Sequence, residues 1–292
     1  SLFVSYGGLT CVLATQLQRA AISEASRRLH HYGTTGARMI LSVTATLDQE
    51  GRLLTASGTP EPDCEASTGC SMGDIVATDA SSATVTVTAH GTAPVERVEL
   101  RNAKSVLETI HPYSARELGR RIRLLWQGAA FRGRGRQIEW NGGLELSGNR
   151  VVGVEPINFY NPDRSVQVAE RGSDGSSLSW QSFTTGGIAG VIITLENPPE
   201  GELRFSAGPI SFETPISDIG SADSPLDDLV YPAEGIDVRV TASRLPDVNP
   251  YTGVAFQRTV PLKRNGDDAI YVCVIQEDGH MAWSSPMYLV NE

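Results

Sequence analysis

The sequence predicts a mostly β protein, in which a short strand–helix–strand piece precedes a long antiparallel β-sandwich-type region. Three observations support this class. Many segments alternate apolar and polar residues, which is the period of a half-buried strand, as in "ATVTVTAHG", "VERVELRNA" and "IDVRVTASRL". Turn-forming sequences separate such segments at short intervals, at residues 141–143, 147–149, 197–201 and 264–268. Almost no helical period occurs after Gly51, which favours a sandwich or a barrel-like domain.

One convincing helix is expected, from about Gln16 to Leu29. Its apolar residues recur every four positions and would lie on one face: Leu17, Ala21, Ala25 and Leu29. Thr15 is the expected N-cap residue, and Gly33 can stop the helix. The next segment, "ARMILSVTATL" at 37–47, is rich in β-branched residues and predicts a strand.

These patterns divide the chain into residues 1–48 and residues 49–292. A single strand–helix–strand unit cannot bury both of its faces alone. Residues 1–48 would therefore either pack on the β region or belong to a larger α/β body, and we favour the second. The chain opens without Met in the apolar "SLFVSYGG", which suggests a processed chain or a fragment.

The composition narrows the classes of function. A hydrophobic content of 40% and a charged content of 20% are those of a soluble globular protein. The formal net charge of −10 argues against a general nucleic-acid-binding surface. No apolar run approaches the ~18 residues of a membrane span, and the start does not resemble a signal peptide. We therefore expect neither a nucleic-acid nor a membrane partner, and the sequence leaves the cellular compartment unknown.

The four cysteines are Cys11, Cys64, Cys70 and Cys273. We expect four free thiols, two of them buried. The alternative is a disulfide between Cys64 and Cys70, which share one Pro/Gly-rich loop and could pair if the protein is exported. A zinc site is disfavoured because the five histidines show no finger-like spacing to these cysteines.

Several long strings resemble one bacterial family of unknown function. They are "GGLTCVLATQLQRAAISEASRRLHHYGTTGAR", "LLWQGAAFRGRGRQIEWNGGLELSGN", "WQSFTTGGIAGVIITL" and the closing "VIQEDGHMAWSSPMYLV". Members of that family are PHP-type (polymerase and histidinol phosphatase) metal-dependent hydrolases, distantly similar to the carbaryl-hydrolase group. The resemblance implies that residues 1–48 are the last helix and strand of a PHP-type body. It also implies that residues 49–292 are the β-rich C-terminal region.

In that family the metal-ligand motifs lie upstream of the segment that resembles the start of this chain, and none of them is present here. The resemblance therefore implies the C-terminal portion of a hydrolase of phosphoesters or related ester or amide bonds, not catalytic alone. Divalent metal ions would belong to the intact enzyme, and no catalytic or metal-ligating residue is assigned here. The implied partners are the N-terminal PHP body and a small-molecule substrate. The alternatives are a non-catalytic β-sandwich module that binds carbohydrate or protein, and a purely structural domain.

The segment "YGTTGAR" at 32–38 contains the candidate substrate-binding residues: Tyr32, Thr34, Thr35 and Arg38. Its amides and hydroxyls could hold an anion, with Arg38 as a clamp. The alternative is a helix stop and a turn whose hydroxyls satisfy local backbone groups. The adjacent His30 and His31 point in different directions at a helix end, so we expect packing or solvation in place of metal binding.

Three further stretches carry candidate chemistry. "RGRGR" at 132–136 predicts an exposed basic strand paired with acids such as Glu139 and Glu145, with phosphate or carboxylate recognition as the alternative. Asp278, His280 and Ser284 lie too close in one turn to form a serine-hydrolase triad. The four tryptophans are expected in the core, with an exposed sugar-binding platform as the alternative: Trp126, Trp140, Trp180 and Trp283.

Overall fold

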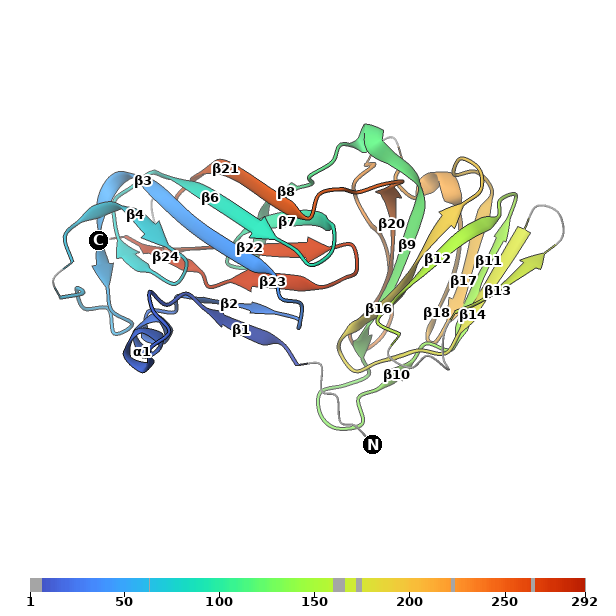
Figure 1. Ribbon diagram of the computed structural model, residues 1–292, viewed down its shortest axis with the longest axis horizontal. Helices are drawn as coiled ribbons and strands as arrows, with labels where there is room; N and C mark the ends of the chain where they lie inside the picture. Colours follow the sequence, from blue (N-terminus) through green and yellow to red (C-terminus); the bar gives the residue numbers. More distant parts are fainter. Residues whose placement is uncertain are drawn as a thin grey trace. The chain divides into compact units, whose positions relative to one another are not determined.

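The computed structural model describes residues 7–62, 64–159, 166–171, 175–221, 224–263 and 266–291. It is mostly β, as the sequence predicts. The chain forms two compact units (Figure 1). Unit 1 combines Ser1–Pro112 with Pro250–Glu292, and unit 2 is the intervening Tyr113–Asn249.

In unit 1, the described residues form one helix and twelve strands, which join in one sheet. The elements are β1 (Leu9–Val12), α1 (Arg19–Arg27), β2 (His31–Thr34), β3 (Ile40–Leu54), β4 (Ser67–Ser71), β5 (Ile75–Ala77), β6 (Ser82–His90), β7 (Val95–Asn102), β8 (Ser105–Ile110), β21 (Gly253–Pro261), β22 (Asp268–Gln276), β23 (Met281–Ser284) and β24 (Met287–Val290). The main path runs β1-β2-β23-β22-β24-β5-β3-β6-β21, and its strand pairs are antiparallel except for β24 with β5.

The long strand β3 connects the two parts of this sheet. Its first residues pair with β6, from Ile40 opposite His90 to Leu47 opposite Ala83. Its last residues pair with β5 instead. The buried faces of both parts supply one hydrophobic cluster, which includes Val43, Val87, Leu100 and Val272. The alternation in "ATVTVTAHG" is confirmed, because the valines of β6 are fully buried while its threonines are partly or fully exposed.

Unit 2 contains twelve strands and two short 3-10 helices in its described part. They are η1 (Ala115–Glu117), β9 (Leu118–Ala129), β10 (Ile138–Glu139), β11 (Gly142–Ser147), β12 (Val151–Ile157), β13 (Gln167–Arg171), β14 (Gly175–Trp180), β15 (Phe183–Thr184), β16 (Ile188–Leu195), β17 (Glu202–Ala207), β18 (Ile210–Pro215), η3 (Ile216–Asp218), β19 (Leu229–Pro232) and β20 (Ile236–Pro246). Two five-stranded sheets run β13-β14-β11-β17-β18 and β12-β16-β9-β20-β19, and β10 pairs with β15.

The two five-stranded sheets share one core. Trp126 on β9 of one sheet stacks on Trp180 on β14 of the other, with ring centroids 4.8 Å apart and planes inclined by 6°. Phe205 on β17 contacts both rings at centroid distances of 6.2 and 5.8 Å. Since aromatic side chains bury the most apolar area per residue, these rings dominate the cluster that joins the two sheets.

The helix is shorter than predicted. α1 begins after Gln18, which makes no side-chain cap, and Thr15 lies outside it. Leu29, with φ of 57°, ends the helix, and the His30 amide donates to the Ala25 carbonyl at 2.9 Å. This is a helix stop of the Schellman type built on Leu29. The expected stop, Gly33, lies in β2 because the chain has already turned into the sheet.

Two other sequence predictions need comment. The turn expected at 141–143 is wrong, because Gly142 and Gly143 lie in β11 between two neighbouring strands. A Cβ on Gly143 would lie 1.9 Å from the Leu178 carbonyl oxygen, so the glycine permits a close backbone approach. The turn expected at 264–268 lies partly outside the described residues. Asp48, the predicted domain boundary, lies within β3 of unit 1, and the assignment of residues 1–48 to an α/β body stays a prediction.

Within the described residues, no helix combines the length and apolar character needed to cross a membrane.

We predict that Phe205→Ala destabilises unit 2 by about 3–5 kcal/mol, because it removes a fully buried ring from the inter-sheet core. The matched control is Phe131→Ala, whose ring is 51% exposed and whose loss should stay within about 0.5 kcal/mol. Denaturant unfolding followed by the fluorescence of the unit 2 tryptophans gives both values. Equal destabilisation by the two variants would contradict this account of the core.

Candidate functional site

The predicted substrate-binding residues lie on β2 and in the turn that follows it. β2 pairs with β1 on one side and with β23 on the other. Tyr32 is 5% exposed, and its hydroxyl donates to the Met39 carbonyl at 2.9 Å. Burial, followed by the neighbouring Cys11 thiol, raises the pKa of Tyr32 to about 12. Tyr32 therefore belongs to the core of unit 1.

The two threonine hydroxyls bond to protein groups. Thr34 Oγ1 donates to the Ala37 carbonyl at 2.8 Å and accepts the Gly36 amide at 3.1 Å. Thr35 Oγ1 lies 2.9 Å from His280 Nδ1 and accepts the Met281 amide at 3.0 Å. These contacts agree with the alternative in which the hydroxyls of this turn satisfy nearby protein groups. Anion binding by either hydroxyl stays a prediction.

Arg38 differs from the other three residues. Its side chain is exposed, and no described residue lies within hydrogen-bond or ion-pair distance of its guanidinium group. A guanidinium stays protonated at any working pH and offers paired donors to a carboxylate or phosphate. Of the four candidates, Arg38 is thus the one whose polar group faces solvent unpaired.

The two histidines have separate environments. His30 Nε2 lies 2.8 Å from Asp74 Oδ1, and Asp74 Oδ2 accepts the Ser71 amide at 2.7 Å. His31 is the first residue of β2. Since α1 ends at Arg27, neither histidine lies on a helical face. Among the described residues, no three His, Cys, Asp or Glu side chains are grouped so that they could hold a metal ion. The described residues therefore offer no set of ligands for the metal ions that the resemblance assigns to the intact enzyme.

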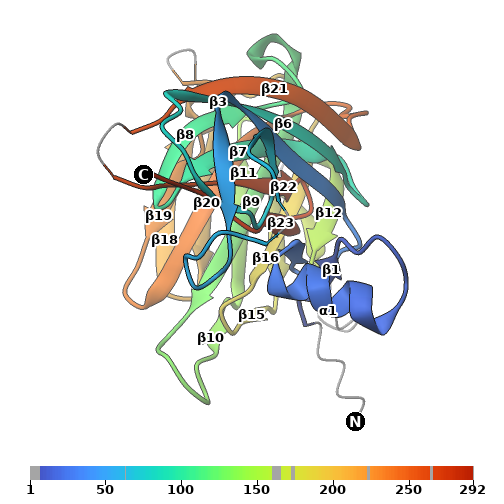
Figure 2. The same ribbon diagram turned by 90° about the vertical axis from the view of Figure 1, so that its left-hand side faces the viewer.

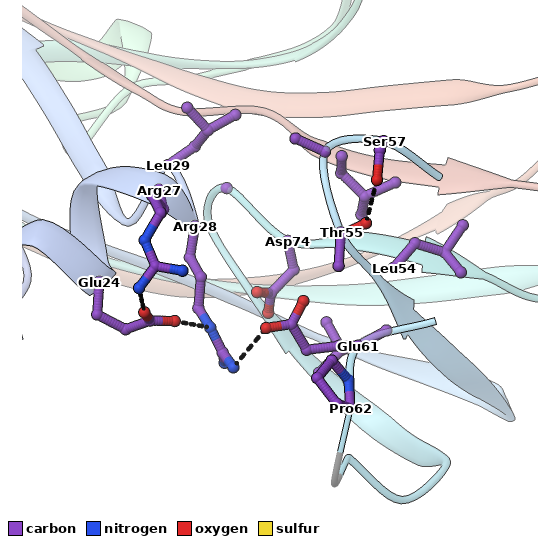
Figure 3. A pocket seen from close by; sticks show the side chains of 14 residues that line it. Glu24, Arg27, Arg28, Leu29, Leu54, Thr55, Ser57, Glu61, Pro62 and Asp74 are labelled. Carbon is purple, nitrogen blue, oxygen red and sulfur yellow. Dashed lines mark hydrogen bonds and ion pairs between the residues drawn. The ribbon is translucent and has the colours of Figure 1, made fainter. Parts of the chain in front are cut away.

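A pocket of about 470 Å³ lies beside α1 in unit 1, a volume typical of sites for small molecules. Its walls come from the end of α1, the end of β3, the loop that follows β3 and the turn between β4 and β5 (Figure 3). Leu29, Leu54 and Ile75 give it apolar surface. The charged side chains are those of Glu24, Arg27, Arg28, Glu61 and Asp74.

Arg28 connects two walls of this pocket. Its Nε donates to Glu24 Oε1 at 2.9 Å, and its Nη2 donates to Glu61 Oε1 at 3.0 Å (Figure 3). Burial by itself would lower the pKa of Arg28, but the hydrogen bond to Glu24 and the Glu61 charge raise it overall. Arg28 thus ties α1 to the loop after β3. A ligand with an apolar body and a hydrogen-bond donor would suit these walls.

No sequence signal would have identified this pocket. Glu24, Glu61 and Asp74 come from three segments far apart along the chain. Each carboxylate is unremarkable in its own segment. They come together because the end of β3, the loop after it and the β4–β5 turn all lie beside the end of α1.

The four cysteines are free thiols, so the disulfide between Cys64 and Cys70 is not present. Cys70 is buried, and its Sγ lies 3.8 Å from Met287 Sδ. Burial, followed by the charge of Asp74, raises the pKa of the Cys70 thiol to about 12. Burial also raises the pKa of Cys273 to about 12. The prediction of two buried thiols is confirmed.

Asp278, His280 and Ser284 do not form a catalytic triad. Asp278 Oδ1 accepts the backbone amide of His280 at 3.0 Å, while the His280 ring contacts Thr35. Ser284 is buried and accepts the Val272 amide at 3.0 Å. Asp278 therefore stabilises the turn between β22 and β23, the His280 ring joins that turn to Thr35, and Ser284 bonds to the backbone of β22.

Three of the four tryptophans are core residues, as predicted: Trp126, Trp140 and Trp180. Trp283 on β23 is 38% exposed.

The prediction that "RGRGR" forms a paired basic strand is wrong. Residues 131–137 are an exposed loop between β9 and β10. Arg132, Arg134 and Arg136 have no ion-pair or hydrogen-bond partner for their side chains among the described residues.

We predict that iodoacetamide labels Cys11 and Cys64 of the native protein at pH 8 much faster than Cys70 and Cys273. The first two are half-buried, whereas the second two combine burial with a pKa of about 12. At pH 8 the thiolate fraction of Cys70 and of Cys273 is on the order of one in ten thousand. Mass spectrometry of tryptic peptides gives the rates, and Cys64→Ser separates the labelling of Cys64 from that of Cys70, which lies in the same peptide. Fewer than four labelled cysteines after unfolding without reductant would contradict the free-thiol assignment.

A family model described as a protein of unknown function (DUF3604) matches residues 2–100. The matched segment lies within unit 1 and includes α1, the 32–38 turn and the residues of the pocket. No curated protein and no solved structure matches the chain.

Proposed function

We propose that this chain is the non-catalytic, β-rich C-terminal portion of a metal-dependent hydrolase that acts on a phosphoester or a related ester or amide bond. In this proposal an N-terminal α/β body of the PHP type holds the divalent metal ions that activate water. The chain itself supplies structure around the site and one substrate-facing turn at residues 32–38. The motifs of the 7–38 segment and of the C-terminus support it by resemblance.

The observation that carries the proposal is the uncovered apolar side of the α1 region. Ala25 is the one buried residue of α1. Leu17 is 96% exposed, and the exposed fractions of Leu13 and Ile22 are 40% and 36%. Figure 2 shows α1 beside β1, at the periphery of unit 1. A helix this short gains most of its stability from tertiary packing.

The apolar residues of this region would suit packing against an α/β body. Exposed apolar patches commonly mark surfaces that another protein part covers. Among the described strands, β1 pairs with β2 alone, and β1 lies beside the same residues. In the proposal, this surface contacts the body, and Arg38 projects toward the substrate from the turn after β2.

A second candidate function is a non-catalytic β-sandwich binding module for carbohydrate or protein. In that proposal the two five-stranded sheets of unit 2 are a β-sandwich, and the pocket of about 470 Å³ in unit 1 is the ligand site. The pocket favours this candidate because it joins apolar walls to several polar groups. The gene sequence upstream of Ser1 distinguishes the two. An in-frame α/β segment with a His-x-His motif supports the hydrolase, and its absence supports the module.

We predict that the purified chain retains no stoichiometric divalent metal ion after incubation with Mn²⁺ or Zn²⁺ and mild dialysis. The reason is that the ligands of the catalytic ions belong to the proposed α/β body. Elemental mass spectrometry gives the metal content, and His30→Ala serves as a control for weak binding at the His30–Asp74 pair. One or more tightly held ions per chain would contradict the proposed division of the enzyme.

We predict that Arg38→Ala, in a protein that joins this chain to its catalytic body, weakens kcat/KM by ~1.5–3 kcal/mol, the contribution of one charged hydrogen bond. Folding should be unchanged because the side chain is exposed. Arg38→Lys should recover part of the loss, since an ammonium keeps the charge without the paired donors. The matched control is Arg52→Ala, another exposed arginine of unit 1. Unchanged kinetics in Arg38→Ala would remove the substrate-positioning role.

A further inference from the structure

The loop between β9 and β10 concentrates positive charge in an acidic protein. Residues 131–137 are all exposed, and the loop extends beyond the strands of unit 2 in both views (Figures 1 and 2). It carries Arg132, Arg134 and Arg136 within five residues, while the whole chain has a formal net charge of −10. The remainder of the chain is therefore still more acidic than this value.

The base of the loop is firmly held. The Ala130 amide donates to the Arg136 carbonyl at 3.0 Å, which closes the loop. Thr184 Oγ1 donates to the Gly128 carbonyl at 2.7 Å and accepts Trp140 Nε1 at 2.9 Å. Trp140 is fully buried in the unit 2 core. The core thus anchors a short loop whose tip consists of solvent-facing residues.

The arginines are not neutralised within the chain. None of the three guanidinium groups has an ion-pair or hydrogen-bond partner among the described residues. Glu139, the nearest acid along the sequence, accepts a hydrogen bond from Asn141 at 3.3 Å. Glu145 lies on β11, opposite Arg204 of β17. Among the described residues, neither acid that the sequence offers as a partner pairs with the three arginines.

Two glycines separate the three arginines of the loop. Gly133 and Gly135 have positive φ values of 131° and 72°, and each follows an arginine whose φ is negative. The conformation favours glycine, which explains the Gly between each pair of arginines. The glycines thus permit the tight loop that carries the three guanidinium groups close together in the sequence.

We propose that the loop of residues 130–136 is a binding site for phosphate groups carried by a compact, multiply charged solute. Guanidinium groups bind phosphate oxygens in pairs. At physiological ionic strength, salt screens the attraction between an exposed arginine and an anion beyond about 8 Å. The three arginines therefore attract mainly the charges of a ligand that lies close to the loop. A long polyanion or an anionic membrane would bring further negative charge close to the acidic remainder of the chain. The proposal is independent of the hydrolase assignment, because it concerns another unit.

The test is isothermal titration of the full chain with tripolyphosphate, with inorganic phosphate as the weaker probe. We expect each of R132A, R134A and R136A to weaken tripolyphosphate binding by about two- to fivefold, the range for exposed charge pairs. The triple alanine variant should weaken it by more than about tenfold. The triple lysine variant should fall between, since lysine lacks the paired donors. Arg116→Ala, an exposed and unpaired arginine elsewhere in unit 2, should leave binding unchanged.

Three results would overturn the proposal. The first is no heat of binding, and the second is an equal loss in Arg116→Ala, which would mean attraction to any surface cation. The third is binding to phosphatidic acid vesicles, but not to tripolyphosphate, that the triple alanine variant abolishes. An unchanged thermal unfolding midpoint of the triple variant shows that it folds. Because the readout is binding, its failure leaves the proposed hydrolase role intact, and failure of the Arg38 kinetics leaves this site intact.

Discussion

The structure of unit 2 depends on the contact between the buried faces of its two five-stranded sheets. Trp126 and Trp180 stack across that contact, and Phe205 packs against both rings. The same core positions the start of the β9–β10 loop that carries Arg132, Arg134 and Arg136. Trp126 donates its Nε1 hydrogen to Ser182 at 3.0 Å, and Trp140 donates to Thr184. Because buried indole N–H groups need acceptors, the hydroxyls that satisfy them fix the segment beside the arginine loop.

Unit 1 follows the same principle with smaller side chains. β3 contributes to both parts of the sheet, so the burial of Val43 and its neighbours requires the chain to cross between them. That crossing places the end of β3 next to α1 and creates the pocket that Arg28 spans. Arg28 stabilises this arrangement by pairing with carboxylates from two segments. Removal of either acid would leave the guanidinium in a partly buried place with one partner fewer.

The sequence predicts the parts of the fold that depend on local period, and it fails where distant segments decide. The valines and threonines of β6 have the predicted faces, since alternation needs nothing beyond one buried side. The end of α1 could not be predicted, because Leu29, and not the expected Gly33, adopts the positive φ that stops the helix. Gly142 and Gly143 have the residue types of a turn, yet they lie in a central strand where neighbouring backbones approach closely. The pocket was missed since its carboxylates are joined by topology alone.

The candidate sites are best understood by asking which polar groups the fold leaves unsatisfied. In the 32–38 turn, the hydroxyls of Tyr32, Thr34 and Thr35 bond to other protein groups, and a group already bonded must give up that bond to hold a ligand. Arg38 and the arginines of the β9–β10 loop give up no protein contact when they bind an anion. Residue type alone did not distinguish a bonded side chain from an unbonded one. The hydrogen-bond partners do, and they are the reason that our two proposals rest on guanidinium groups without a partner among the described residues.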